Sequence, residues 1–106
     1  MRLILDTNFI IYLLKYKIEL PKEYKIYILD KSIKELEKLK ANLALKFIKV
    51  KNISLIKTKS SRNVDDLLLT FKDDIIATQD KELKKSLKQK HIKIMIIRQK
   101  KYLKVI

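Results

Sequence analysis

The sequence predicts an α/β fold in which a mostly parallel sheet carries helices on both faces. Short apolar segments of strand length alternate along the whole chain with segments whose apolar residues recur at helical spacing. Such alternation favours parallel strands joined by helical crossovers. A further observation is that acidic residues follow several of the apolar segments, beginning with Asp6 after Leu3–Leu5. In parallel sheets this edge is the usual place for a ligand.

The expected elements follow from periodicity and from turn and capping residues. Strands are expected at residues 2–5, 26–29, 53–56, 75–77 and 92–97, with 99–106 as an edge strand or a tail. Helices are expected at residues 7–14, from Ser32 onward, and at 42–49, 64–71 and 80–88. In the third helix, Leu43, Phe47 and Val50 are expected to face the core.

Length and composition bound the class of protein. A chain of 106 residues predicts a single domain, covering residues 1–106. The chain has no cysteine and one histidine, His91, so disulfides and zinc sites built on cysteine or several histidines are excluded. We find no apolar run of roughly 20 residues and no signal peptide, and therefore expect a soluble, cytoplasmic protein that does not bind membranes.

The charge is strongly basic. Twenty-six lysines and arginines stand against twelve acids, which gives a formal net charge of +14. A field of this sign attracts polyanions, most simply the backbone of RNA or DNA. The alternative is compositional, because biased codon usage or a hot habitat also enriches lysine.

Four acids stand just after expected strands or near helix starts, namely Asp6, Glu35, Asp65 and Asp80. Right-handed crossovers would bring these positions to one edge of the sheet. Clustered carboxylates are the ligands that Mg²⁺ and Mn²⁺ prefer, and such ions activate water and stabilise leaving oxygens in phosphodiester cleavage. A basic surface around the acids would then hold a nucleic acid, as in a nuclease.

Helix capping is the alternative explanation of the same acids. Ser32 and Glu35 fit the capping-box pattern, Asn63 with Asp66 is similar, and Asp80 could cap the last helix. Periodicity also leaves the choice between Glu35 and Glu37 open.

Four segments, in the same order along nearly the whole chain, resemble the motifs of PIN-domain nucleases. Leu3-Ile4-Leu5-Asp6-Thr7-Asn8 resembles the family's opening strand with its terminal aspartate. Ser32-Ile33-Lys34-Glu35-Leu36 resembles the segment of the second acid, and Val64-Asp65-Asp66-Leu67-Leu68-Leu69 that of the third. Ile75-Ile76-Ala77-Thr78-Gln79-Asp80-Lys81-Glu82-Leu83 resembles the strand, Thr and fourth acid, and is the most specific match.

This resemblance implies a PIN-like three-layer α/β/α sandwich with Mg²⁺- or Mn²⁺-dependent ribonuclease activity. It implies that Asp6, Glu35, Asp65 and Asp80 are both catalytic and metal-binding, with Asp66 as the alternate to Asp65. Thr7 and Asn8 would support them through hydrogen bonds. Three other acids are interpreted as loop or cap residues: Asp30, Asp73 and Asp74.

Two branches of the family compete for the biological role. The double acid Asp65-Asp66 and the segment Ile96-Ile97-Arg98-Gln99-Lys100-Lys101-Tyr102-Leu103 resemble the archaeal branch that processes rRNA precursors. The alternatives are a toxin-type ribonuclease restrained by an antitoxin protein, and a PIN domain that binds RNA without cleaving it. The family resemblance also implies that a homodimer is an option.

Basic side chains near the fourth motif are candidates for RNA contact. Lys81, Lys84, Lys85 and Lys88 recur at helical spacing and would line one face of the helix after Asp80. The remaining candidates follow the last confident strand: Arg98, Lys100 and Lys101.

Overall fold

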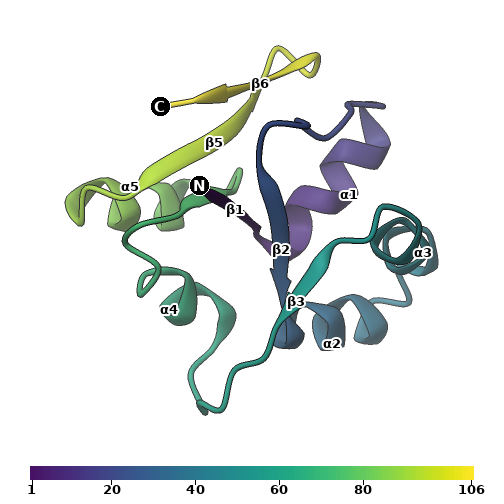
Figure 1. Cartoon of the computed structure of the whole chain (residues 1–106), viewed down its shortest axis with the longest axis horizontal. Coiled ribbons are helices and arrows are strands. Elements are labelled where there is room, and N and C mark those ends of the chain that lie inside the picture. The colour runs from purple at the N-terminus through teal and green to yellow at the C-terminus, as the bar shows by residue number, and fades with distance from the viewer.

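The computed structural model describes residues 1–106 and places a six-stranded sheet between two layers of helices (Figure 1). The strands are β1 (Arg2–Leu5), β2 (Lys25–Leu29), β3 (Ser54–Ile56), β4 (Ile75–Ala77), β5 (Lys93–Arg98) and β6 (Tyr102–Val105). The helices are α1 (Thr7–Lys15), α2 (Asp30–Lys38), α3 (Asn42–Val50), α4 (Val64–Leu68) and α5 (Lys81–Gln89). The strand order is β3-β2-β1-β4-β5-β6, with β1 to β5 parallel and β6 antiparallel to β5.

The central strand β1 is buried on both faces because every one of its last three residues is apolar. Leu3 and Leu5 pack into one hydrophobic cluster and Ile4 into the other, as the alternation of a strand requires. All three are fully buried. Asp6 therefore emerges from the middle of the molecule, at the carboxyl end of the most protected strand.

The two clusters lie on opposite faces of the sheet and define the layers. The larger one includes residues of α1, α2 and α3, such as Phe9, Leu36 and Ile48. The smaller one includes residues of α4 and α5, such as Leu68 and Leu87. The predicted fold class, an α/β/α sandwich with a mostly parallel sheet, is confirmed.

The C-terminal segment forms an edge strand. Residues Tyr102–Val105 pair antiparallel with β5 after a tight turn at Gln99 and Lys100, both at positive φ. Of the two alternatives for residues 99–106, the edge strand is correct. No helix of the chain combines the length and the apolar character needed to cross a membrane.

Three predicted helices differ in detail from the structure. Helix α2 begins at Asp30, two residues before the expected start, and α4 ends at Leu68 instead of Phe71. In α3 the predicted core face is only partly correct. Phe47 packs against the core as predicted, but Leu43 and Val50 are exposed, and Ala44 and Ile48 are the buried residues. The small Ala44 side chain lets α3 approach the rest of the core closely, which leaves the larger Leu43 outside.

Helix ends are closed without glycine. Four helices are followed by a residue at positive φ, and the next amide closes the helix end by bonding to a carbonyl five residues back. One of these residues is His91, which lies in the turn before β5. The other residues at such helix ends are Lys17, Lys40 and Asn52.

Candidate active site

The topology creates a crevice at the carboxyl ends of β1 and β4. These strands are neighbours in the sheet, yet the chain leaves β1 through α1 on one face and leaves β4 toward α5 on the other. The loops therefore diverge at this point, which is the usual ligand position in open α/β sheets. Asp6 follows β1 directly, and Thr78 and Asp80 follow β4.

A pocket of about 450 Å³ opens at this crevice. It collects all four predicted acids and both predicted supporting residues, although they come from four distant segments of the chain. Asp66 and Glu37 do not line it, so Asp65 and Glu35 are the acids that face the pocket. Its lining comprises Asp6, Thr7, Asn8, Glu35, Lys38, Leu39, Asp65 and Asp80.

Asp6 is the most buried of these acids, with 9% of its surface exposed. Its Oδ1 accepts a hydrogen bond from the Thr7 amide at 2.8 Å, and its Oδ2 accepts one from the Thr78 hydroxyl at 2.7 Å. Burial raises the pKa of Asp6, the two hydrogen bonds oppose this, and the charges of Asp65 and Asp80 raise it further. The carboxylate is thus oriented by two donors but lacks a cationic partner.

Glu35 reaches the pocket from α2 and is held by Thr7. The Thr7 hydroxyl donates to Glu35 Oε1 and lies 2.9 Å from the hydroxyl of the buried Ser32. A threonine hydroxyl has one proton, so donation to Glu35 leaves the Thr7 oxygen to accept a hydrogen bond. Thr7 therefore links the first and second acids, its amide holding Asp6 and its side chain holding Glu35.

The capping box predicted at Ser32 and Glu35 is wrong, because both residues lie inside α2 and the helix has no side-chain cap at Leu29. The cap at Asn63 is confirmed, since its side chain accepts from the Asp66 amide at 2.9 Å. Asp80 is also a cap, accepting from the Leu83 amide at 2.9 Å. Capping and the pocket are therefore compatible, because a carboxylate has more acceptor positions than one cap uses.

Asp65 lies in the first turn of α4 and makes no cap. Burial is the main cause that raises its pKa, followed by the charges of Asp80, Glu35 and Asp66. The charge of Asp80 raises the pKa of both Asp6 and Asp65, so these carboxylates repel one another across the pocket. A cation between them would relieve this repulsion.

The donor set suits a hard divalent cation. All four acids offer carboxylate oxygens, and no histidine or cysteine is near them. No three acidic side chains stand at the spacing of a closed coordination cage. The oxygen donors nevertheless suit an ion such as Mg²⁺, which keeps several of its waters and takes only one or two carboxylates directly.

Sequence reasoning assigned no role in the site to two residues that contribute to it. Thr78 orients Asp6 and Ser32 supports Thr7. Lys38 adds an ammonium to the pocket lining. The one signal for Thr78 is its place in the segment that resembles the fourth motif. Ser32 stands three residues before Glu35, a spacing that also puts two residues on the same face of a helix.

The other acids lie outside the pocket, as interpreted. Asp30 accepts bonds from the amide and hydroxyl of Thr58, and Asp74 forms a two-pronged ion pair with Arg2 at 2.7 and 3.0 Å. Asp73 is exposed. None of the predicted RNA-binding residues lines the pocket. Lys81 directly follows Asp80, whereas Lys100 lies over the ring of Tyr16 at the far end of α1.

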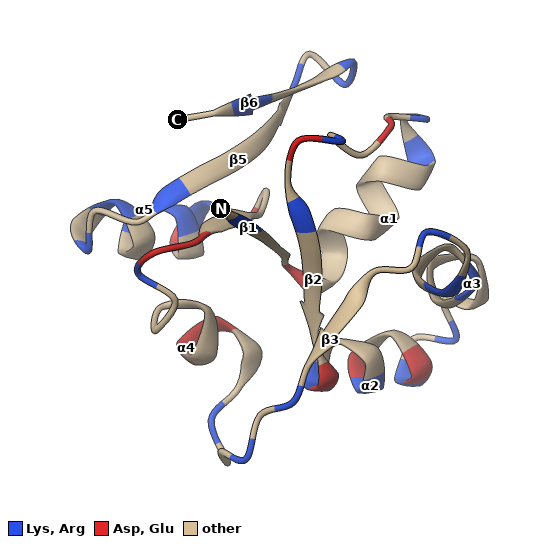
Figure 2. Ribbon diagram, viewed as in Figure 1, with Lys and Arg blue, Asp and Glu red and all other residues tan.

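Basic side chains are spread over most of the molecule, while the acids are few (Figure 2). Arg2–Asp74 is the only salt bridge. The excess of positive charge is therefore not neutralised by ion pairs within the chain, and four of the twelve acids line the pocket.

Comparison with known proteins agrees with this geometry. No protein-family model matches the chain. The chain is 34% identical to Ribonuclease VapC4 of Methanocaldococcus jannaschii, in an alignment that covers 98% of this chain and 95% of that protein. Its structure is similar to the PIN domain endonuclease Utp24, with a TM-score of 0.84, 28% identity and coverage of 98% and 90% of the two chains. This chain belongs to the PIN-domain ribonuclease family.

Proposed function

We propose that the protein is a divalent-metal-dependent endoribonuclease that hydrolyses RNA phosphodiester bonds in the pocket of Asp6, Glu35, Asp65 and Asp80. The convergence of these four carboxylates, from distant segments of a basic chain, carries the proposal. A phosphodiester is itself anionic, so a pocket with four carboxylates and one ammonium would repel it unless a cation lay between them. Membership of a ribonuclease family supplies the substrate class.

Asp6 would be the principal metal ligand. Its two hydrogen bonds leave further acceptor positions on both oxygens, and the donors fix the plane of the carboxylate. Asp65 and Asp80 would complete the set, directly or through water. Bound Mg²⁺ or Mn²⁺ would supply an activated water and neutralise charge on the phosphate.

Glu35 would orient the attacking water. Its Oε1 is engaged by Thr7, which leaves Oε2 free to accept a hydrogen bond from water in the pocket. Lys38 would contact the phosphate, because it contributes the only ammonium in the pocket lining. Asn8 would donate to the substrate or to water through its side-chain amide.

Two basic surfaces meet at the pocket and would carry the RNA backbone. One is the predicted stripe on α5, in which Lys81, Lys85 and Lys88 are exposed and Lys84 is half-exposed. The other lies along α2, where a second cavity of about 270 Å³ shares Glu35 and Lys38 with the pocket and adds Lys31 and Lys34. Lysines at these positions suit sequence-independent contact with phosphates.

Two biological roles fit this site. A role in processing rRNA precursors is favoured by the resemblance of Asp65-Asp66 and of the β5–β6 segment to that branch. A toxin-type role is favoured by the similarity to VapC4 and by an apolar groove, lined by Ile11, Leu14 and Leu43, on which an antitoxin could dock. A second copy of the chain could cover the same groove.

Cleavage of labelled RNA tests the chemistry. Wild type and the variants Asp6→Asn and Asp80→Asn are compared on single-stranded RNA, tRNA and rRNA precursor, with Mg²⁺, Mn²⁺ or EDTA. We expect cation-dependent cleavage that each substitution lowers by on the order of 10³-fold. Asparagine keeps the shape and much of the capping ability, so the fold should survive, and circular dichroism checks this.

The pair Asp65→Asn and Asp66→Asn provides the matched control. Only Asp65 lines the pocket, so we expect a large loss of cleavage for Asp65→Asn and near-wild-type cleavage for Asp66→Asn. Wild-type cleavage that persists in EDTA would refute metal dependence. RNA binding without any cleavage would instead favour a PIN domain that binds RNA without cutting it.

A further inference from the structure

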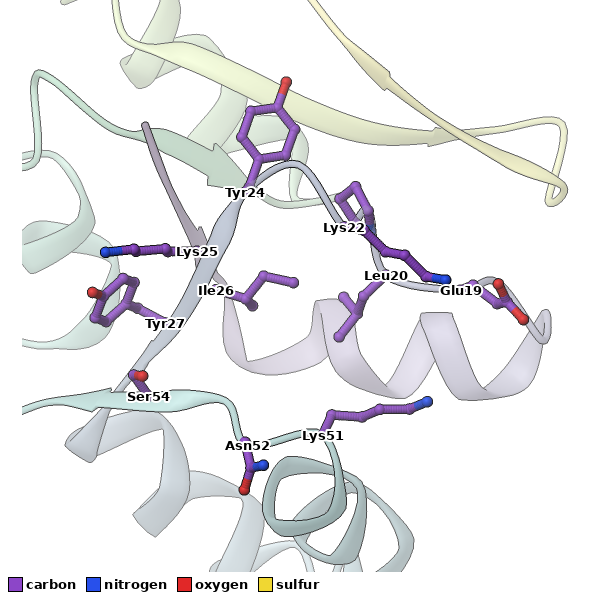
Figure 3. A pocket seen from close by; sticks show the side chains of 11 residues that line it. Glu19, Leu20, Lys22, Tyr24, Lys25, Ile26, Tyr27, Lys51, Asn52 and Ser54 are labelled. Atoms are coloured by element: carbon purple, nitrogen blue, oxygen red, sulfur yellow. The ribbon is translucent and has the colours of Figure 1, made fainter.

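A second cavity, of about 580 Å³, lies at the opposite edge of the sheet from the acids. It is formed by the loop before β2, the first residues of β2 and the turn between α3 and β3 (Figure 3). The pocket of carboxylates lies beyond the carboxyl ends of β1 and β4, whereas this cavity lies at the amino end of β2. Nothing in the proposed cleavage chemistry uses it.

The cavity exists because β3 is shorter than β2. Strand β3 pairs with β2 from Tyr27 onward, and Lys25 and Ile26 pair only with β1 on the other side. Before β3, the chain turns at Asn52, which has positive φ, instead of running on beside β2. One side of β2 is therefore left open at Lys25 and Ile26.

The lining is basic and unneutralised. Lys22, Lys25 and Lys51 contribute to it against the single acid Glu19, and no carboxylate lies within ion-pair distance of any of these lysines. In Figure 3, Lys22 and Lys51 extend in the same direction from either side of Leu20. Such an arrangement attracts an extended anionic chain.

Aromatic and polar groups stand beside the lysines. Tyr27 is already covered by the guanidinium of Arg2, at 5.1 Å, but Tyr24 has no cation or ring partner. Tyr24 is half-buried and comes from the segment that enters β2. Asn52 and Ser54 add an amide and a hydroxyl. Tyr24 packs in part against the larger hydrophobic cluster, which leaves only its exposed portion for a ligand. Lysine, this partly exposed ring and short polar side chains together suit phosphate, base and sugar.

We propose that this cavity is an exosite that binds a single-stranded segment of the RNA substrate away from the bond that is cut. The proposal rests on the proposed function in that the RNA is the nuclease's own substrate. By the strand register, Lys25 lies beside Arg2, four residues before Asp6, and therefore about 13 Å along the sheet from Asp6. At about 3.4 Å per stacked nucleotide this distance is about four steps, so an RNA of a few nucleotides reaches both sites and a dinucleotide does not. The exosite therefore favours longer single-stranded substrates.

Binding is tested with the double variant Lys22→Ala/Lys51→Ala in an Asp6→Asn background, which prevents cleavage. The matched control is Lys46→Ala/Lys49→Ala, which removes the same charge from exposed positions of α3 that line neither cavity. The probe is a labelled single-stranded RNA of about 30 nucleotides, longer than one site covers. We expect the cavity variant to bind about 10-fold more weakly and to lower the salt slope by about 1.4.

The control variant Lys46→Ala/Lys49→Ala should change RNA affinity and salt slope much less than Lys22→Ala/Lys51→Ala does. Equal losses for the two double variants would overturn the exosite and leave only a general effect of charge. The exosite would also be overturned if the Asp6→Asn protein itself showed no salt-sensitive RNA binding.

Cleavage with Asp6 intact separates the exosite from the active site. Lys22→Ala/Lys51→Ala should slow the cutting of the long RNA at subsaturating concentration but leave cleavage of a dinucleotide unaffected, because a dinucleotide, at about 3.4 Å per stacked nucleotide, cannot span both sites. Slower cleavage of both the long and the short RNA would contradict an exosite. If wild type cuts nothing while the binding difference persists, the proposed chemistry fails and the RNA site stands.

A direct signal comes from Tyr24→Trp, since the chain contains no other tryptophan. In the Asp6→Asn background, stacking of a base on the indole should quench its fluorescence when the long RNA is added, and Lys22→Ala/Lys51→Ala should weaken the quenching. RNA that binds without changing this fluorescence would place the contact elsewhere.

Discussion

Asp6 and Asp30 accept the same kinds of hydrogen bond, yet their pKa values shift in opposite directions. Each follows a parallel strand and opens a helix, and each accepts the next amide at 2.8 Å. Each also accepts a threonine hydroxyl at 2.7 Å, from Thr78 after β4 in one case and Thr58 after β3 in the other. Yet the pKa of Asp6 is raised and that of Asp30 is lowered.

The difference lies in what surrounds the two motifs. Asp6 stands between buried strands and faces Asp65 and Asp80, so burial and repulsion exceed the effect of its hydrogen bonds. Asp30 directly follows β2, one strand from the edge of the sheet, where the hydrogen bond from Thr58 is the largest effect on its pKa and the charge of Lys34 also lowers it. The same local motif therefore joins two segments at one strand end and, at the other, holds a carboxylate that we propose as a metal ligand.

The largest expected effect on stability concerns Asp30. Asp30→Ala removes a charged acceptor that links α2 to the segment after β3, and we expect a loss of about 2 kcal/mol of unfolding free energy at pH 7. Because the folded pKa is lowered, this contribution is complete above the unfolded pKa of about 3.9 and disappears as pH falls through the folded pKa. Urea denaturation at several pH values measures it.

Asp73→Ala is the control, because Asp73 is exposed and makes no ion pair. It should change stability little at any of these pH values. Cleavage by folded Asp30→Ala should stay near wild type, and a large loss would show that Asp30 belongs to the site after all.

Sequence patterns predicted the layers of the fold and the positions of the acids because both depend on local signals. Apolar runs define β1 and β4, and the acids follow them within a few residues, so Asp6 and Asp80 could be identified before the structure. Periodicity left Glu35 and Glu37 open, and the family resemblance selected Glu35, but the helix start was predicted wrongly. That start is set by Asp30, which bonds to Thr58, 28 residues away, and no local pattern reveals such a partner.

Thr78 and Thr58 sharpen the comparison between the two motifs. Thr78→Val removes the hydroxyl that orients Asp6, so we expect cleavage to fall about 10-fold, as for the loss of a group supporting a metal ligand. Thr58→Val removes the matching hydroxyl beside Asp30 and should leave cleavage nearly unchanged. Each substitution should cost about 1 kcal/mol of stability.

Thr78→Ser restores a hydroxyl at the same position and should recover most of the cleavage. Equal activity losses in Thr78→Val and Thr58→Val would mean that the two strand ends do not differ in function. Steady-state cleavage rates and chemical denaturation, measured on the same preparations, separate the two effects.

Packing contacts were harder to predict than the site. The apolar stripe of α3 was placed on Leu43, whereas the structure buries Ala44, since both alternatives satisfy helical periodicity. The link between Thr78 and Asp6 joins residues 72 positions apart, and a threonine after a strand is too common to signal it. Such details depend on how elements meet, which one sequence does not encode locally.

The smallest expected effect is a gain. Asp65→Asn removes a carboxylate whose pKa is raised by partial burial and by Asp80, so we expect a small gain of stability in EDTA, limited by solvent screening because Asp65 is exposed. Asp66→Asn changes a residue outside the pocket and should add less stability than Asp65→Asn. In saturating Mg²⁺ the wild type should instead be more stable than Asp65→Asn, because the wild type then gains the binding free energy of the ion. If Asp65→Asn destabilised the protein in EDTA, Asp65 would be a structural acid like Asp30, and the contrast between the two strand ends would rest on Asp6 alone.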